Sequence, residues 1–273
     1  MVRTFLATLL VLLAISVDAS AAVGATHVER PPGVIDRTPR VAVISAFEPE
    51  LATLLKNVTG KRGYRVNGVE FTTGKLRGKP VVLFLSGISM TNAAMNTQLV
   101  LDRFNVTHIV FSGIAGGVNP ALNVGDVVVA ERWAQYLEIL AAREVSPGSF
   151  APPGWMDDVK LPNFGMMHPR PVEVRSAAQP QLSKKFWFEA DPGMLAAARN
   201  LKVDLAACAA GTCLKHPPRL VVGGNGVSGQ AFMDNKAFRE YTFDTFHANI
   251  EEQDPAAAIA AAGPLIRHVH ISE

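Results

Sequence analysis

The 273-residue sequence has little excess of either charge: 26 Lys and Arg stand against 24 Asp and Glu, a formal net charge of +2. A protein that binds nucleic acid or an anionic membrane through its overall charge carries a larger positive excess, so neither partner is expected. The sequence also lacks internal repeats and low-complexity tracts, and 48% of its residues are hydrophobic. These features indicate a globular protein that buries one sizeable core.

Long hydrophobic runs are absent as well. The apolar segment Phe5–Val17, preceded by Arg3, is shorter than the roughly 20 residues of a membrane-spanning helix. Small residues follow it and end at Ala21 or Ala25, which is the pattern of a cleavable signal peptide. We therefore expect a signal peptide over residues 1–25, export to the periplasm or the medium, and no membrane contact after cleavage.

Only two cysteines are present, Cys208 and Cys213, in the stretch CAAGTC. In an exported chain a disulfide between them is favoured. Two free thiols remain an alternative, and so does a metal site, although His216 is the one further ligand nearby. We predict no bound metal and no cofactor.

From residue 40 onward the sequence alternates between β-branched runs and segments with helical spacing. RVAVISAF (40–47) is typical of a strand, and residues 48–57 carry Leu51, Leu54 and Leu55 at helical spacing. Such alternation predicts one α/β domain over 40–273, with a central mixed twisted sheet and helices on both faces. Residues 26–39 read as an N-terminal extension. The alternation breaks in a Pro- and Trp-containing stretch, 132–219, which we interpret as an insertion.

Two predicted strands end in glycine-rich backbone, SGIAGG (112–117) and VVGGNGVSGQ (221–230). Ligands of open α/β sheets bind at the carboxyl ends of strands, where glycines allow close approach to the main chain. The first stretch is not a phosphate loop, because it contains no GxGxxG and no Gly-Lys-Ser/Thr follows it. Phe232 and Met233 follow the second stretch and are suited to stacking on a flat base.

A third element, AFEPE (46–50), places Glu48 and Glu50 after the first strand. Two acidic residues in the first turn of a helix are often only charges that favour the helix N-terminus. Their place at the carboxyl end of a strand also fits a general base that activates water.

Taken together, these stretches resemble the nucleoside phosphorylase superfamily, and within it exported 5′-methylthioadenosine/S-adenosylhomocysteine nucleosidases. The resemblance runs from about Arg40 to Asn249. It rests on AFEPE and on three longer motifs: SGISMTNAA (86–94), SGIAGGVNPALNVGDVVV (112–129) and GNGVSGQAF (224–232).

The resemblance implies hydrolysis of the N-glycosidic bond of a purine nucleoside by a homodimer. Glu50 matches the family carboxylate near the attacking water and ribose. The expected substrate-binding residues are Ala115 and Gly116 beside the base, together with Phe232 and Met233. Water is favoured over phosphate because no arginine stands just before Ser112.

The carboxyl-terminal stretch departs from the family pattern. Where the family has Met-Glu-Ser/Thr-Ala, this sequence has Gln253-Asp254-Pro255-Ala256, and no later Ser-Asp follows. Asp254 is then the expected second catalytic residue, with Gln253 at the substrate. Because Asp is one methylene shorter than Glu, we expect impaired turnover. A non-catalytic nucleoside-binding relative and a purine nucleoside phosphorylase are the alternatives.

Overall fold

The computed structural model describes residues 33–135, 141–154, 171–209, 211–230, 236–246 and 248–251. The predicted signal peptide lies outside these described residues. These described residues lie in one compact unit. It is the single α/β domain that the sequence predicts.

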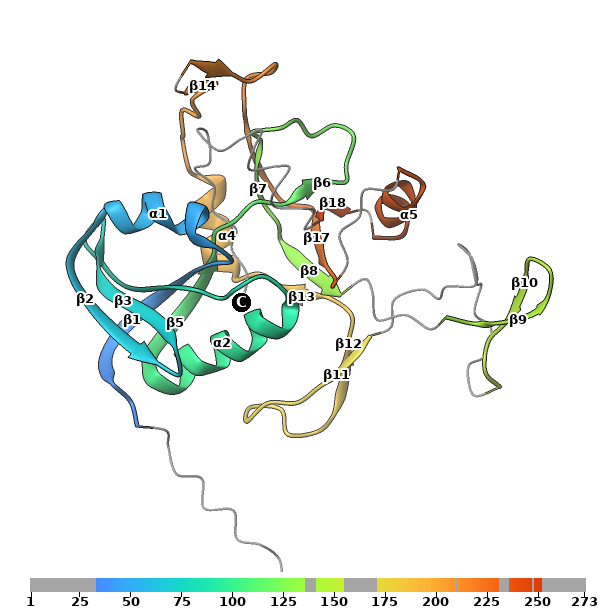
Figure 1. Ribbon diagram of the computed structural model, residues 1–273, viewed down its shortest axis with the longest axis horizontal. Helices are drawn as coiled ribbons and strands as arrows, with labels where there is room; N and C mark the ends of the chain where they lie inside the picture. Colours follow the sequence, from blue (N-terminus) through green and yellow to red (C-terminus); the bar gives the residue numbers. More distant parts are fainter. Residues whose placement is uncertain are drawn as a thin grey trace, which may run out of the picture. The chain divides into compact units, whose positions relative to one another are not determined.

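Five strands form a mixed sheet in the order β2-β3-β4-β1-β5 (Figure 1). β1 is parallel to β4 and to β5, whereas β2, β3 and β4 pair antiparallel. The carboxyl ends of β1, β4 and β5 therefore lie along one edge. The strands are β1 (Asp36–Ser45), β2 (Val58–Val66), β3 (Val69–Leu76), β4 (Lys79–Leu85) and β5 (Phe104–Phe111).

Helices cover both faces of this sheet, as predicted (Figure 1). Alternate residues of β1 point to opposite faces. Ile44 packs in a core cluster with Val100 of one helix, and Val43 packs with Leu51 of the other. The helices are α1 (Glu48–Lys56) and α2 (Met90–Arg103).

Strand β2 is not expected from the sequence pattern, since most of its side chains are exposed and few are apolar. Its position follows from the hairpin turns. Asn67 and Gly68 have φ of 49° and 84°, and Arg77 and Gly78 have φ of 47° and 81°. Two consecutive positive φ angles are typical of a type I′ turn, which joins adjacent antiparallel strands.

A second group of strands contains two consecutive parallel pairs. β7 pairs with β16, and a few residues further along in each of these two segments β8 pairs with β17. The strands are β7 (Val127–Val129), β8 (Arg132–Gln135), β16 (Leu220–Val222) and β17 (Asn225–Ser228). β17 also pairs with β18 (Ala248–Glu251), and β8 with β13 (Phe188–Glu189). β6 (Gly116–Gly117) completes the sheet at its far edge, beside β18.

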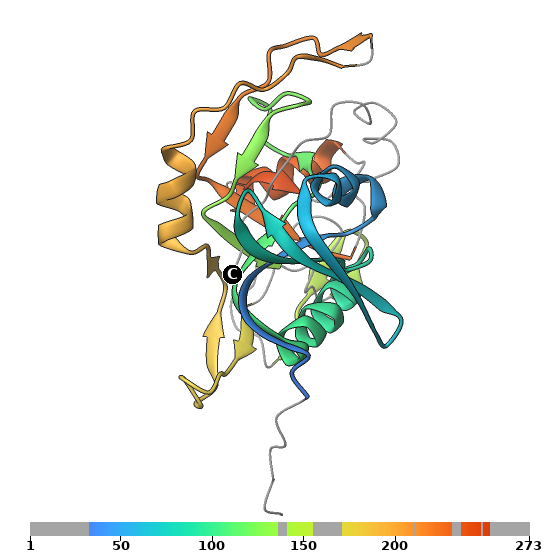
Figure 2. The same cartoon turned by 90° about the vertical axis from the view of Figure 1, so that its left-hand side faces the viewer.

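Three elements inside the stretch 132–219 belong to this core. β8 pairs with β17 and with β13, and α4 (Pro192–Arg199) packs Leu195 and Ala198 against Val129. Figure 2 shows α4 as the yellow-orange helix beside β16. Two short hairpins occupy more of the stretch: β9 (Arg143–Ser146) with β10 (Ser149–Ala151), and β11 (Val172–Val174) with β12 (Ser183–Lys185). The domain boundaries proposed from the sequence stay a prediction.

Cys208 and Cys213 form a disulfide, so the favoured of the three sequence-based alternatives is confirmed. The bond joins the directly paired residues of a short hairpin, β14 (Cys208–Ala209) with β15 (Thr212–Cys213). Leu214, which follows the hairpin, packs against Gly125, where an added Cβ would lie 2.3 Å from Leu214 Cδ1.

The N-terminal half of β1 contains an ion pair between Asp36 and Arg40. Asp36 Oδ2 lies 2.7 Å from Arg40 Nη2, and Arg40 also donates to the carbonyls of Gly74 and Val81. Burial by itself raises the pKa of Asp36. Hydrogen bonds from Thr38 and Arg40 and the charge of Arg40 outweigh it and hold this pKa below its ordinary value of 3.8.

The remaining helix, α5 (Lys236–Phe246), precedes β18. Among the described residues, no helix combines the length and the apolar character that crossing a membrane requires.

Candidate active site

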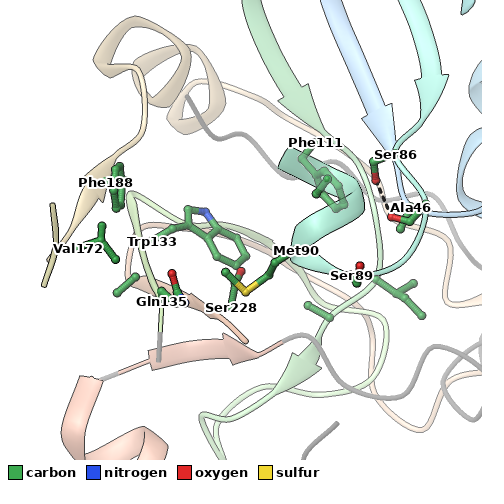
Figure 3. A pocket seen from close by; sticks show the side chains of 15 residues that line it. Ala46, Ser86, Ser89, Met90, Phe111, Trp133, Gln135, Val172, Phe188 and Ser228 are labelled. Carbon is green, nitrogen blue, oxygen red and sulfur yellow. Dashed lines mark hydrogen bonds between the residues drawn. The ribbon is translucent and has the colours of Figure 1, made fainter. Parts of the chain in front are cut away.

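A cavity of about 360 Å³ opens at the carboxyl ends of β1, β4 and β5. One face of β8, β13 and β17 forms its opposite side (Figure 3). This is the edge at which α/β sheets bind ligands. Its lining residues are Ala46, Ser86, Gly87, Ser89, Met90, Ala93, Phe111, Ile114, Ala115, Trp133, Ala134, Gln135, Val172, Phe188 and Ser228.

Glu50 lies directly behind this wall. It is 6% exposed, and its two carboxylate oxygens accept hydrogen bonds from two backbone amides. Oε2 is 2.7 Å from the nitrogen of Ala46, and Oε1 is 2.8 Å from the nitrogen of Ile114. Both of these residues line the cavity. The amides come from the ends of β1 and β5, so the fold of the sheet determines where the carboxylate lies.

Gly113 provides the space for this carboxylate. A Cβ at Gly113 would lie 2.7 Å from Glu50 Oε1 and 2.9 Å from Phe111 Cε1. Carbon atoms do not approach so closely without displacement. The glycine-rich sequence after β5 is therefore required by the packing of Glu50, in addition to any approach of a ligand.

The N-terminus of α2 forms another part of the wall. Ser89 caps the helix by accepting a hydrogen bond from the backbone N–H of Asn92. Its φ of 97° and ψ of 149° lie in a region that almost only glycine adopts. Asn96 donates to the Ser86 carbonyl at 2.7 Å, which fastens α2 to the end of β4. A strained backbone is thus held in place beside the cavity.

The structure describes some of the residues predicted from the sequence and leaves others outside the described parts of the chain. Ala115 lines the cavity, and Gly116 follows it in β6, where it pairs with β18. Glu48 is exposed, unlike Glu50. The other predicted residues lie outside the described parts of the chain: Phe232, Met233, Gln253 and Asp254.

Sequence reasoning did not predict the side of the cavity formed by the second group of strands. Trp133 and Gln135 of β8 and Phe188 of β13 line it. All three fall in the stretch interpreted as an insertion. The one sequence signal was that all three tryptophans of the chain lie in that stretch, where a flexible linker would be polar.

The described residues offer no obvious metal centre. No group of three or more His, Cys, Asp or Glu side chains comes together within them. Both cysteines are engaged in the disulfide.

A family model described as "Phosphorylase superfamily" matches residues 40–263. The chain belongs to the phosphorylase superfamily. This match, which includes Glu50 and the glycine-rich strand ends, confirms the superfamily inferred from the motifs, and the exported character stays a prediction. The match also extends over the carboxyl-terminal departure around Asp254.

This superfamily member is similar to several proteins named as nucleosidases. The 5′-methylthioadenosine/S-adenosylhomocysteine nucleosidase of Bacillus cytotoxicus is 33% identical over 170 residues, which cover 62% of this chain and 74% of the relative. The nucleosidase of the same name from Bacillus anthracis is 29% identical over 221 residues, which cover 75% of this chain and 96% of the relative. A crystal structure of the Colwellia psychrerythraea nucleosidase in complex with adenine has 25% identity and a TM-score of 0.54, covering 85% of this chain and 80% of its own.

Proposed function

We propose that this protein hydrolyses the N-glycosidic bond of a purine nucleoside such as 5′-methylthioadenosine or S-adenosylhomocysteine. The observation that carries the proposal is the position of Glu50, a buried carboxylate held by two backbone amides directly behind the cavity wall. The nucleosidases to which the chain is similar support the same reaction class.

Glu50 is suited to two tasks in this reaction. Cleavage of the bond passes through an oxocarbenium-like transition state, in which positive charge develops on the ribose and a nearby carboxylate stabilises it. A carboxylate has about four lone-pair sites, so accepting two amides is compatible with accepting a hydrogen bond from water. Glu50 then orients the water and takes its proton as the C–O bond forms, while the electrons of the C–N bond leave with the base.

Water is favoured over phosphate as the nucleophile. Sites that bind phosphate use Arg or Lys side chains that pair with its oxygens. The described residues that line the cavity include no Arg and no Lys. Its wall consists mainly of apolar side chains, with hydroxyls and one amide.

One alternative has a specific observation in its favour. A nucleoside-binding relative without turnover is supported by Asp254-Pro255, which replaces the family Glu and lies outside the described residues. A misplacement of about one ångström at the ribose reduces the rate roughly 100-fold. Proline also disfavours helical geometry at the residue before it.

Release of adenine from 5′-methylthioadenosine by purified mature protein tests the proposal. The assay is run with and without inorganic phosphate, and the sugar product is identified by mass spectrometry. Phosphate-independent release of adenine with a free reducing sugar supports hydrolysis. Formation of a sugar 1-phosphate indicates a phosphorylase, and tight adenine binding without release indicates the non-catalytic relative.

Export and dimerisation belong to the proposal on separate grounds. Export rests on the charged start, short apolar segment and small residues of positions 1–25. The homodimer rests on the family resemblance. Intact mass of protein recovered from the periplasm tests the first, and light scattering of the purified protein tests the second.

A further inference from the structure

Positive charge is concentrated in the first part of the chain, although the overall charge is nearly balanced. Between Leu51 and Leu101 the sequence holds seven Lys and Arg residues, and its one acidic residue is Glu70. Glu70 is paired with Arg65, directly opposite it in the β2–β3 hairpin. The other six cations are all exposed: Lys56, Lys61, Arg62, Lys75, Arg77 and Lys79.

Three of these cations lie where β3 turns into β4. Lys75 is near the end of β3, Arg77 is in the turn, and Lys79 begins β4. This is the amino end of β4, whereas the cavity opens at its carboxyl end. The two ends are about 20 Å apart, because a strand rises about 3.3 Å per residue. A partner bound by these cations would therefore leave the cavity open.

Two more cations join them from α1 and β2. Val58 pairs with Leu76, so the start of β2 lies beside the β3–β4 turn. Lys56 ends α1 two residues before Val58, and Lys61 lies in the β-bulge that follows Thr59. We call this set of five cations the basic end of the sheet: Lys56, Lys61, Lys75, Arg77 and Lys79.

The described acidic side chains do not neutralise the basic end. Among the described residues, none of its five cations takes part in an ion pair. Asp36 is brought near this end by Arg40, which also donates to the carbonyls of Gly74 and Val81. That arginine already balances the charge of Asp36. The basic end thus keeps its positive charge in the folded protein.

Arg77 occupies a position at which arginine is unusual. Its φ of 47° is in the left-handed region, and Gly78 follows it with a φ of 81°. The β2–β3 turn has similar angles and contains Asn67-Gly68, the ordinary sequence of a type I′ turn. Asn adopts a positive φ far more readily than Arg does. A cation is therefore present at the tip of the β3–β4 turn in spite of the backbone preference, which points to a role beyond folding.

Ordinary structural roles explain only part of this arrangement. Cations on an edge strand prevent pairing with another chain, and this accounts for Lys61 of β2. A cation in the last turn of a helix complements the helix dipole, which accounts for Lys56. Neither reason applies to Lys75, Arg77 and Lys79, since β3 and β4 are interior strands of their sheet.

The composition of the basic end fits a diffuse anionic surface. Four of its five cations are lysines, which are compact charges on flexible stems, whereas arginine pairs with phosphate in a fixed bidentate geometry. The aromatic residues of the stretch 51–101 are Tyr64, Phe71 and Phe84, and all three are buried or half-buried, so no exposed ring offers stacking to a base. Clusters of about four to eight Lys and Arg are typical of binding to anionic lipid headgroups.

We propose that the basic end is a membrane-contact surface, which binds the anionic headgroups of a phospholipid bilayer and leaves the cavity facing away from it. The overall charge did not predict such a partner, because acidic residues elsewhere in the chain offset these cations. The contact does not depend on the reaction carried out in the cavity.

Cosedimentation with vesicles tests the proposal. The protein used lacks residues 1–25, since the apolar segment Phe5–Val17 would itself enter a bilayer. At low ionic strength it should bind vesicles of phosphatidylglycerol mixed with phosphatidylcholine, and not vesicles of phosphatidylcholine alone. Binding should weaken steeply between about 0.01 M and 0.1 M salt, because the screening length falls from about 30 Å to about 10 Å. Failure to bind the anionic vesicles, or equal binding to both kinds, would overturn the proposal.

The triple variant Lys75→Gln/Arg77→Asn/Lys79→Gln removes three cations from exposed positions of the basic end. Each cation near a charged bilayer contributes about fivefold to the affinity, so this variant should bind anionic vesicles about 100-fold more weakly. Circular dichroism checks that it is folded.

The matched control is Arg175→Gln/Lys184→Gln/Lys202→Gln, which makes the same change in overall charge at exposed positions outside the basic end. It should weaken vesicle binding less than about fivefold. Equal losses in the two triple variants would show that overall charge determines binding, and would overturn the assignment to the basic end.

Arg77→Asn alone separates binding from folding. Asn suits the φ of 47°, so the free energy of unfolding should not fall, whereas binding to anionic vesicles should weaken about fivefold. Unchanged affinity would overturn the role of Arg77. Tighter binding to a DNA duplex than to anionic vesicles at the same salt concentration would overturn the choice of partner.

Discussion

Replacing Glu50 by glutamine changes one oxygen of a carboxylate into an NH2 group. Both oxygens of Glu50 accept backbone hydrogen bonds, at 2.7 Å from Ala46 and 2.8 Å from Ile114. Whichever way the amide is turned, its NH2 group therefore faces a backbone N–H donor. The variant keeps the shape of the side chain and loses the match of donors and acceptors.

The stability loss can be estimated from these contacts. A buried hydrogen bond to a charged group contributes about 1.5–3 kcal/mol, and one of the two is lost outright. We expect Glu50→Gln to lower the free energy of unfolding by about 2–3 kcal/mol, measured by urea titration. The protein should remain folded at room temperature if its total stability lies in the ordinary range of about 5–15 kcal/mol.

The catalytic loss should be larger than the stability loss explains. An amide cannot take a proton from water or stabilise an oxocarbenium ion by charge, and loss of an essential base reduces the rate about 100-fold to 10,000-fold. The assay is adenine release from 5′-methylthioadenosine, at a temperature where circular dichroism shows the variant to be folded.

Glu48→Gln is the matched control, because Glu48 is exposed on the same helix. It should change neither the rate nor the stability appreciably. A folded Glu50→Gln protein that turns over as fast as wild type would refute the role assigned to Glu50. Equal loss in both variants would show that the burial of Glu50 is not what matters.

Three further variants follow from the structure. Gly113→Ala places a Cβ 2.7 Å from Glu50 Oε1, so it should slow adenine release as Glu50→Gln does; a wild-type rate would contradict this. Ser89→Gly relieves a φ of 97° and should raise the free energy of unfolding by about 1 kcal/mol in urea titration, whereas lower stability would mean that Ser89 is not strained. Asp36→Asn should lower the free energy of unfolding above pH 3.8, because the ion pair with Arg40 holds the pKa of Asp36 in the folded protein below its ordinary value. This stabilisation is present above the pKa of the unfolded chain and is lost as the pH falls through the pKa of the folded protein. A difference in stability from wild type that does not change with pH would contradict the linkage.

Local patterns predicted the first half of the fold well. β1, α1 and α2 follow from residue periodicity, because apolar residues at strand and helix spacing must face a core. The carboxyl-end rule for parallel strands then brought Ala115 to the cavity and Glu50 to its wall. The roles of Phe232, Met233, Gln253 and Asp254 stay predictions, since those residues lie outside the described parts of the chain.

By itself, the sequence determined the α/β class, the superfamily and the neighbourhood of Glu50, because these depend on short motifs and on periodicity along the chain. Only the tertiary structure decided that Trp133, Gln135 and Phe188 face the same cavity. Their strands are two to four residues long and carry no periodic signal of their own. β8 forms because it pairs with β13 and with β17. Its partner β17 is more than 90 positions away in the sequence, as the contact of Arg132 with Asn225 shows. Such pairings are stabilised by contacts between distant segments, which a local sequence pattern does not contain.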